Sequence, residues 1–378
     1  MFGHKFDLRL PDKGVSILGL SLILIGAIAV SSSSIEYAAK YFGSPWHYTL
    51  RHLFYIILSL SIGFFVYLIP VQFWLETGAF WLLLAIALLM FVLIPGVGRE
   101  INGSQRWLPL GVVSFQPSEF AKFATITFLS GYLVRHNESI SRDWFSFLKP
   151  VLVTLAMAVL LLMEPDFGAA VIVTGTVGTM LFLAGVRLIH FFSLAAIAAA
   201  ALAMLAVSVP YRVQRLVAYV DPWSDPYANG YQLVQSLIAF GRGDWFGVGL
   251  GNSVQKLFYL PEAHTDFVFA IWAEELGAIG ALLVMLIYAG LVARIIWIGW
   301  QSGKVGNFFG AHFCNGFAIL IFGQAVINIG VTMGLLPTKG MTLPLISWGG
   351  TSLLVTVLML SIVLRIEQDI KLRRESID

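Results

Sequence analysis

The feature that most constrains this chain is a series of apolar runs, each about as long as the ~20-residue helix that crosses a lipid bilayer. About ten such runs follow one another, centred near residues 25, 60, 87, 126, 156, 177, 198, 283, 321 and 355. Hydrophobic residues make up 58% of the chain and charged residues only 12%, about half the ~25% of an average soluble domain. So much apolar surface cannot be buried in one core and has to face lipid. The sequence therefore predicts an all-α, polytopic integral membrane protein with about ten transmembrane helices.

The charge and cysteine counts exclude several classes of protein. A formal net charge of +2, with the basic residues spread along the chain, does not suit nucleic-acid binding. The single cysteine, Cys314, permits no intrachain disulfide and no thiolate metal cluster. The sequence contains no GxxxxGK[ST] phosphate loop, which excludes ATP-driven pumping by this chain alone. We therefore expect membrane lipids, and no nucleic acid, as partners.

The order of the spans predicts the topology of the protein. An even number of spans places both termini on one side, and the larger share of lysine and arginine in short connections makes that side cytoplasmic. We expect one membrane domain over residues 1–378, with one large extracytoplasmic loop over residues 210–266 between the seventh and eighth spans. Its amphipathic stretch Tyr231 to Phe240 indicates an ordered element rather than a linker. We therefore look for the function on the outer face.

Charged residues near membrane depth are costly, so each one is a candidate functional residue. In QPSEFAKF, Glu119 and Lys122 stand at i and i+3 on one helical face, which suits either a buried ion pair between helices or a role in a substrate cavity. In EPDFG, Glu164 and Asp166 flank a proline between the fifth and sixth spans, where Asp166 could simply cap the next helix.

The stretch LPEAHTDFVFAIWAEELG closes the long loop and holds three more carboxylates. Asp266 stands where the loop ends and the eighth span begins, so it could cap that helix or act as a base on a lipid-borne substrate. Glu274 and Glu275 follow about 12 Å deeper at a rise of about 1.5 Å per residue. Because they are adjacent on a helix, they point about 100° apart and should not face the same cavity. Glu275 is a candidate for substrate binding.

Basic residues on the same outer face are candidates for binding a diphosphate. Arg99 and Arg106, in GREINGSQRW, carry the forked donors that suit phosphate oxygens, although solvated loop arginines would look the same. Lys339 lies in LLPTKGMTLPLISWGGTS, whose irregular backbone at membrane depth has to be buried or line a cavity. The glycines of GRGDWFGVGLGN could form an anion-binding nest or belong to a flexible loop.

The order of these motifs resembles a known family. GSQRW with QPSEFAK, then EPDFG, DPWSDPYANGYQLVQSLIAFGRGDWFGVGLGNSVQKLFYLPEAHTDFVFAIWAEELG and PTKGMTLPLISWGGTS, is similar to the SEDS family of membrane glycosyltransferases, which has FtsW and RodA types. The resemblance covers nearly the whole chain. PTKG followed by TLP resembles the FtsW type, which acts in cell division. Trp348 stands where the family commonly has tyrosine.

The resemblance implies polymerisation of lipid II, the undecaprenyl-diphosphate-linked disaccharide pentapeptide, into the β-1,4 glycan strands of peptidoglycan. It implies Asp266 as the catalytic residue. One carboxylate is enough in such a reaction, because lipid diphosphate is already a good leaving group and only the acceptor hydroxyl needs a base. Arg99, Arg106, Lys339 or a divalent cation such as Mg²⁺ or Mn²⁺ would stabilise the departing diphosphate. Glu119 and Lys122 would line or brace the cavity.

The resemblance also implies partners and a location. It implies the class B penicillin-binding protein FtsI, a transpeptidase, in a complex with FtsQ, FtsB, FtsL and FtsN, in the bacterial cytoplasmic (inner) membrane at the division septum. Three alternatives stay open: a flippase for lipid II, a non-catalytic scaffold of the division complex, and an elongation polymerase of the RodA type. A flippase should tolerate loss of Asp266 better than loss of Glu119 or Lys122.

Overall fold

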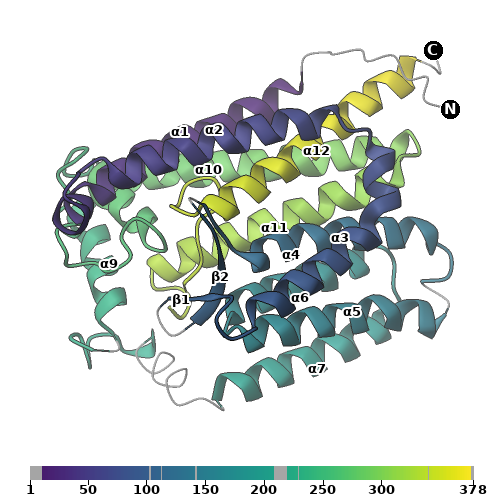
Figure 1. The fold of residues 1–378 in the computed structure, drawn as a ribbon, viewed down its shortest axis with the longest axis horizontal. Coiled ribbons are helices and arrows are strands. Elements are labelled where there is room, and N and C mark those ends of the chain that lie inside the picture. The colour runs from purple at the N-terminus through teal and green to yellow at the C-terminus, as the bar shows by residue number, and fades with distance from the viewer. Residues whose placement is uncertain are drawn as a thin grey trace.

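The structure, a computed structural model, is a bundle of long helices that run back and forth between two ends (Figure 1). It describes residues 11–101, 104–111, 113–140, 143–207, 219–228, 230–338 and 340–375. The first helix begins and the last helix ends at one end of the bundle, here called the terminal end. The strands and α9 lie at the opposite end, here called the loop end (Figure 1).

The described helices match the predicted spans. Each predicted centre lies inside a helix, and seven of the described helices are long and apolar enough to cross a membrane. The prediction of a polytopic helical membrane protein is confirmed. All the helices with described bounds are α1 (Lys13–Phe42), α2 (His47–Leu68), α3 (Val71–Val92), α4 (Pro117–Arg135), α5 (Trp144–Met163), α6 (Phe167–Leu183), α7 (Leu188–Val207), α9 (Tyr231–Gly243), α10 (Val268–Lys304), α11 (Phe308–Thr332) and α12 (Gly350–Glu375).

Short polar side chains determine where several helices begin. The carboxylate of Asp12 accepts from the backbone N–H of Val15 at 2.8 Å and caps α1. Asp143 caps α5, and Asp166 caps α6 by accepting from Ala169 N at 3.1 Å. Each cap satisfies a backbone donor that the first helical turn leaves free. The interpretation of Asp166 as a helix cap is therefore confirmed.

A small antiparallel sheet, which the sequence analysis did not predict, connects α3 to α4 at the loop end. Its strands are β1 (Arg99–Ile101), β2 (Ser104–Leu110) and β3 (Val113–Phe115), in the order β1-β2-β3. Strands this short carry little periodic signal in the sequence. The sheet places the two candidate arginines on paired strands, where the sequence analysis had expected a loop.

The segment between α11 and α12, residues 333–349, turns back into the bundle and is called the re-entrant segment. Leu343, Leu345 and Ile346 on it are buried. The hydroxyl of Tyr288, on α10, donates to the carbonyl of Pro344. The close approach of α1 requires Gly26, because a β-carbon there would lie 2.7 Å from the carbonyl oxygen of Leu345. Of the two possibilities for this irregular backbone, burial in protein holds for residues 343–347.

Candidate active site at the loop end

Asp266 lies just before α10 and faces the re-entrant segment. The N-cap residue of α10 is Phe267, whose side chain makes no capping hydrogen bond, so the interpretation of Asp266 as the N-cap residue is wrong. The side chain of Asp266 is half-buried. A β-carbon at Gly340 would lie 2.8 Å from Asp266 Oδ2, so the carboxylate lies against the re-entrant segment. Lys339, the next residue in sequence to Gly340, lies outside the described residues.

The buried side chain of Asn328 connects the Asp266 backbone to the re-entrant segment. Asn328 lies on α11 and is 2% exposed. Its Nδ2 donates to the carbonyl of Asp266 at 2.8 Å and to the carbonyl of Met341 at 2.6 Å. The sequence analysis missed this residue, although an asparagine within an apolar span is the kind of signal that marks a functional position.

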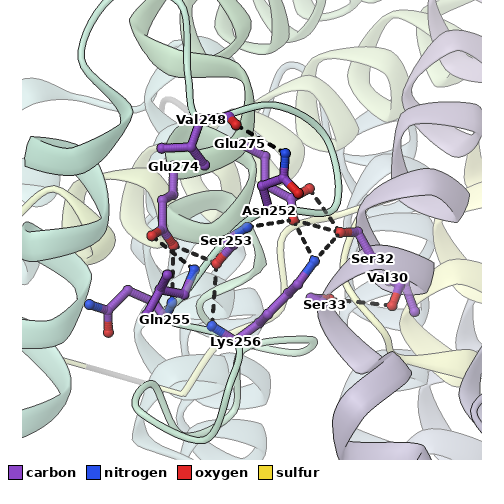
Figure 2. A network of polar contacts seen from close by, with 11 residues as sticks. Val30, Ser32, Ser33, Val248, Asn252, Ser253, Gln255, Lys256, Glu274 and Glu275 are labelled. Atoms are coloured by element: carbon purple, nitrogen blue, oxygen red, sulfur yellow. Dashed lines mark hydrogen bonds and ion pairs between the residues drawn. The ribbon is translucent and has the colours of Figure 1, made fainter.

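Glu274 and Glu275 anchor the connection between α9 and α10 (Figure 2). Glu275 accepts from Lys256 Nζ at 2.8 Å and from Ser32 Oγ, on α1, at 2.7 Å. Glu274 accepts from Arg242 Nε at 3.0 Å and from the hydroxyl of Ser253. Both carboxylates are at most 1% exposed. Their main partners differ, as their divergent directions predict, but Ser253 contacts both because its backbone N–H also donates to Glu275 at 3.4 Å.

Glycines on both sides of the contact allow the connection between α9 and α10 to pack tightly on α10. Gly277 interrupts α10 with φ +69°, and the N–H of Ala278 donates to the carbonyl of Asp244 at 2.8 Å. A β-carbon at Gly247 would lie 2.1 Å from the carbonyl oxygen of Glu275, and one at Gly243 would lie 2.1 Å from that of Ala273. Gly243 and Gly247 are therefore required for close backbone contact, whereas nothing lies within 4 Å of a β-carbon at Gly241 or Gly251, and the anion nest stays a prediction.

The two candidate arginines differ in their surroundings. Arg106 is half-buried, and its guanidinium donates to the carbonyls of Glu164, at 3.0 Å from Nε, and of Pro165. Arg106 thus fastens β2 to the turn between α5 and α6. Arg99, on β1, is exposed. Glu164 itself is fully buried, and neither of its carboxylate oxygens has a hydrogen-bond partner.

Glu119 and Lys122 form an ion pair within the bundle. Lys122 Nζ lies 2.7 Å from Glu119 Oε1, and both residues are buried on α4. Lys122 also borders a narrow gap between α4, α6 and α11, which has no room for a water molecule. Pro117 occupies the first turn of this helix, where its missing N–H costs no hydrogen bond. The pair therefore balances two buried charges within α4, and a role in bracing or lining a substrate cavity stays a prediction.

Comparison with known proteins identifies the family. A family model described as "Cell cycle protein", FTSW_RODA_SPOVE, matches residues 13–372. The chain belongs to this family. Membership confirms the resemblance seen in the sequence motifs.

Curated relatives match this family member over nearly its whole length. The probable peptidoglycan glycosyltransferase FtsW of Hahella chejuensis is 50% identical over 365 residues, which cover 96% of this chain and 91% of that protein. The protein of the same name from Legionella pneumophila is 48% identical over 362 residues, which cover 96% of this chain and 92% of that protein.

Two solved structures share the fold. The rod shape determining protein RodA of Thermus thermophilus is 27% identical, with a TM-score of 0.71, and the match covers 96% of this chain and 98% of that one. A chain from the structure described as "Structural coordination of polymerization and crosslinking by a peptidoglycan synthase complex" is 29% identical, with a TM-score of 0.77, and the match covers 95% and 98% of the two chains.

The candidate site in this family member offers one carboxylate rather than a metal-binding cluster. Among the described residues, no group of three or more histidine, cysteine, aspartate or glutamate side chains is placed to hold a metal ion. Magnesium is often held by one or two carboxylates together with substrate phosphates, so Asp266 alone suits a cation shared with a diphosphate. Such a cation would supply positive charge for the leaving group, and the use of Mg²⁺ or Mn²⁺ stays a prediction.

Proposed function

We propose that this multi-pass membrane protein is a peptidoglycan glycosyltransferase that polymerises lipid II into β-1,4 glycan strands. One observation carries the proposal. The carboxylate of Asp266 lies at the loop end against the buried re-entrant segment, in a chain 50% identical to a probable peptidoglycan glycosyltransferase. A half-buried carboxylate with its backbone fixed by Asn328 is well placed to hold and release a proton.

In the proposed reaction, Asp266 accepts the proton of the acceptor sugar's 4-hydroxyl as that oxygen attacks the anomeric carbon of the donor. The bond to the lipid diphosphate breaks in the same step, and undecaprenyl diphosphate leaves with the electron pair. A single displacement inverts the anomeric centre, so an α-linked donor gives a β-1,4 linkage. Asp266 can act alone because the diphosphate needs no proton to leave.

We assign the stabilisation of the departing diphosphate first to Lys339. Lys339 is adjacent in sequence to Gly340, which lies against the Asp266 carboxylate. Arg99, exposed on β1, is the second candidate. Arg106 already donates to two backbone carbonyls, and Glu275 already accepts from Lys256 and Ser32. Both therefore support the site by holding its surroundings in place.

We further propose that the protein works in septal synthesis at the inner membrane with a crosslinking partner. The FtsW name of its relatives supports the septal role, and a related solved structure describes polymerization and crosslinking in one complex. The partner on this proposal is the class B penicillin-binding protein FtsI, together with FtsQ, FtsB, FtsL and FtsN. Residues 210–266 would face the periplasm, and both termini the cytoplasm.

The flippase alternative has less structural support. Glu119 and Lys122 would have to serve a transport route, but they pair with each other at 2.7 Å. The gap beside Lys122 has no room for a water molecule, so it is too narrow for a disaccharide.

The test of the proposal is the Asp266→Asn variant, purified in detergent with the partner transpeptidase and given labelled lipid II and Mg²⁺. We expect glycan ladders from the wild-type protein and a loss of about 10²-fold or more in polymerisation rate for the variant, because the amide cannot accept the proton. Asp221→Asn, which changes an exposed carboxylate at the loop end, is the control and should keep full activity. Equal polymer yield from Asp266→Asn and wild type would refute the role of Asp266 as the base. Movement of lipid II across vesicle bilayers without any ladder would favour the flippase.

A further inference from the structure

Exposed aromatic rings from two distant segments meet at the loop end. Tyr37 and Tyr41 lie near the end of α1, and Phe258 lies on the connection between α9 and α10. The rings of Tyr37 and Tyr41 are 4.6 Å apart between centroids, and the Phe258 ring lies 6.4 Å and 6.3 Å from them. These three rings, here called the aromatic shelf, are 37%, 58% and 43% exposed in that order. A cluster of exposed rings is a surface suited to a ligand.

The aromatic shelf is joined to the chain segment that carries Asp266. The ring of His264, two residues before Asp266, lies 5.4 Å from the Tyr37 ring and 4.6 Å from the Tyr48 ring. The carbonyl of His264 accepts from the N–H of Trp348 at 3.0 Å. Burial lowers the pKa of His264, so its ring is neutral at pH 7 and packs as an apolar group. The shelf and the carboxylate are therefore parts of one packed unit.

The conformation of Phe258 and the charge beside it define the character of this surface. Phe258 has φ +68°, a left-handed conformation that is strained for a bulky residue and is often found at ligand sites. The ammonium of Lys40 lies 4.2 Å from the centroid of the Phe258 ring. The shelf thus combines ring faces, tyrosine hydroxyls and one positive charge.

We propose that the aromatic shelf binds the sugar units of the growing glycan strand and guides that strand at Asp266. This inference rests on the proposed function, because its ligand is the product of that reaction. The apolar C–H faces of pyranose rings pack on aromatic rings, and their hydroxyl and amide groups can bond to the tyrosine hydroxyls. Lys40 suits the carboxylates of the peptide stems.

A neighbouring groove supports a lipid-linked strand as the occupant. Glu36, next to Tyr37 in sequence, lines a groove of about 650 Å³ together with Ile28 and Ile35 of α1 and with Leu250 and Lys256. Its wall is mostly apolar and includes the hydroxyl-bearing Ser31 and Ser32 and the charged Glu36 and Lys256. A strand with its lipid in this groove would have its sugars at the aromatic shelf.

The first experiment measures binding without turnover. The full-length Asp266→Asn protein in detergent would be titrated calorimetrically with soluble, uncrosslinked glycan tetrasaccharide peptides. We expect Phe258→Ala with Tyr41→Ala to weaken binding about tenfold, because two ring contacts are lost. Phe258→Tyr keeps all three rings and both tyrosine hydroxyls and should bind normally, and Phe246→Ala, which removes an 82% exposed ring elsewhere, is the control. No measurable binding by the parent protein, or equal binding by the alanine variant, would overturn the proposal.

The second experiment separates this inference from the proposed function. In the protein with Asp266 intact, the alanine variant should still consume lipid II but make shorter strands, because the growing strand dissociates sooner. Strands of unchanged length would overturn the inference about the shelf but would not contradict the proposed polymerase function. If the alanine variant binds glycan normally but no longer co-purifies with the transpeptidase, the shelf is a protein interface instead. If it binds glycan normally but is retained less well in lipid nanodiscs, the shelf is a membrane anchor.

Discussion

At the scale of single residues, Asn328 has the most direct structural link to the proposed base. Its side chain satisfies the carbonyls of Asp266 and Met341 from a third element, α11. Leucine has a similar volume but no donors. Each carbonyl left buried without a partner costs about 1–3 kcal/mol.

We therefore expect Asn328→Leu to lower the melting temperature and to slow polymerisation further than the loss of folded protein explains. Thermal unfolding in detergent and lipid II turnover, both measured at a temperature where the variant is folded, check this expectation. Thr332→Val is the control on the same helix, because the Thr332 hydroxyl bonds only within α11, to the carbonyl of Ile329. A variant as active as Thr332→Val would show that Asn328 does not position Asp266.

The buried carboxyl group of Glu164 makes the stability of the protein depend on pH. Burial, and to a lesser degree Asp166, raises the pKa of Glu164 from 4.5 to about 8, against the opposing charge of Arg106. Between these two pKa values the folded protein keeps a proton that the unfolded chain has lost. Stability therefore falls as pH rises from about 5 to 8, by at most about 1.4 kcal/mol per pH unit from this group.

Glu164→Gln is neutral at every pH, so it should lack this component. We expect the melting temperature of the variant, measured relative to that of wild type, to increase as pH rises from 5 to 8. Above pH 8 this difference should stay constant. Melting curves across this range check the prediction. Glu100→Gln, at an exposed site on β1, should follow wild type. Parallel curves for Glu164→Gln and wild type would contradict the proposed burial of a neutral acid.

At the scale of elements, the broken helix α10 and the connection packed on it form one unit. The N–H groups of Val248 and Gly249 donate to the carbonyls of Glu274 and Glu275 at 3.0 Å each. The connection thus forms hydrogen bonds with the carbonyls of α10 near Gly277, where the helix is interrupted. This arrangement fixes the direction from which the chain approaches Asp266.

Two glycines of this connection form a matched test. Gly247 and Gly251 have φ +79° and +84°. Alanine at either position is held in a left-handed conformation, which destabilises the folded protein by about 1–2 kcal/mol. Only Gly247 also faces the backbone of α10, since nothing lies within 4 Å of a β-carbon at Gly251. We expect Gly247→Ala to lower the melting temperature and to expose the connection to limited proteolysis, while Gly251→Ala shows the smaller effect. Equal effects would mean that the connection does not pack as described.

At the scale of the whole molecule, the two ends of the bundle should lie on opposite sides of the membrane. Cysteine labelling tests this, because the native Cys314 is fully buried and should not react. We expect Phe246→Cys, at the loop end, to react with a membrane-impermeant maleimide in spheroplasts. Lys304→Cys, where α10 ends at the terminal end, should react only after permeabilisation. The reverse pattern would invert the proposed topology and place the site away from the cell wall.

The membrane class, the helical spans and the family motifs could be predicted from the sequence because each depends on residues close together in the chain. A run of about 20 apolar residues matches the bilayer thickness whatever packs beside it. The cap at Asp166 and the paired charges of Glu119 and Lys122 are likewise local, since i, i+3 spacing brings side chains together on any helix.

The arrangement of the candidate site depends on contacts between residues far apart in the sequence, and only the tertiary structure determines these. Asn328 reaches Asp266 across 62 positions and Ser32 reaches Glu275 across 243, so no local pattern reports either contact. The same packing makes Arg106 donate to the turn after α5 and places the Asp266 carboxylate against Gly340. Residue types in a sequence indicate which chemistry is available, whereas burial and hydrogen-bond partners decide which groups are already occupied, because a polar group in a low-dielectric interior has to be paired.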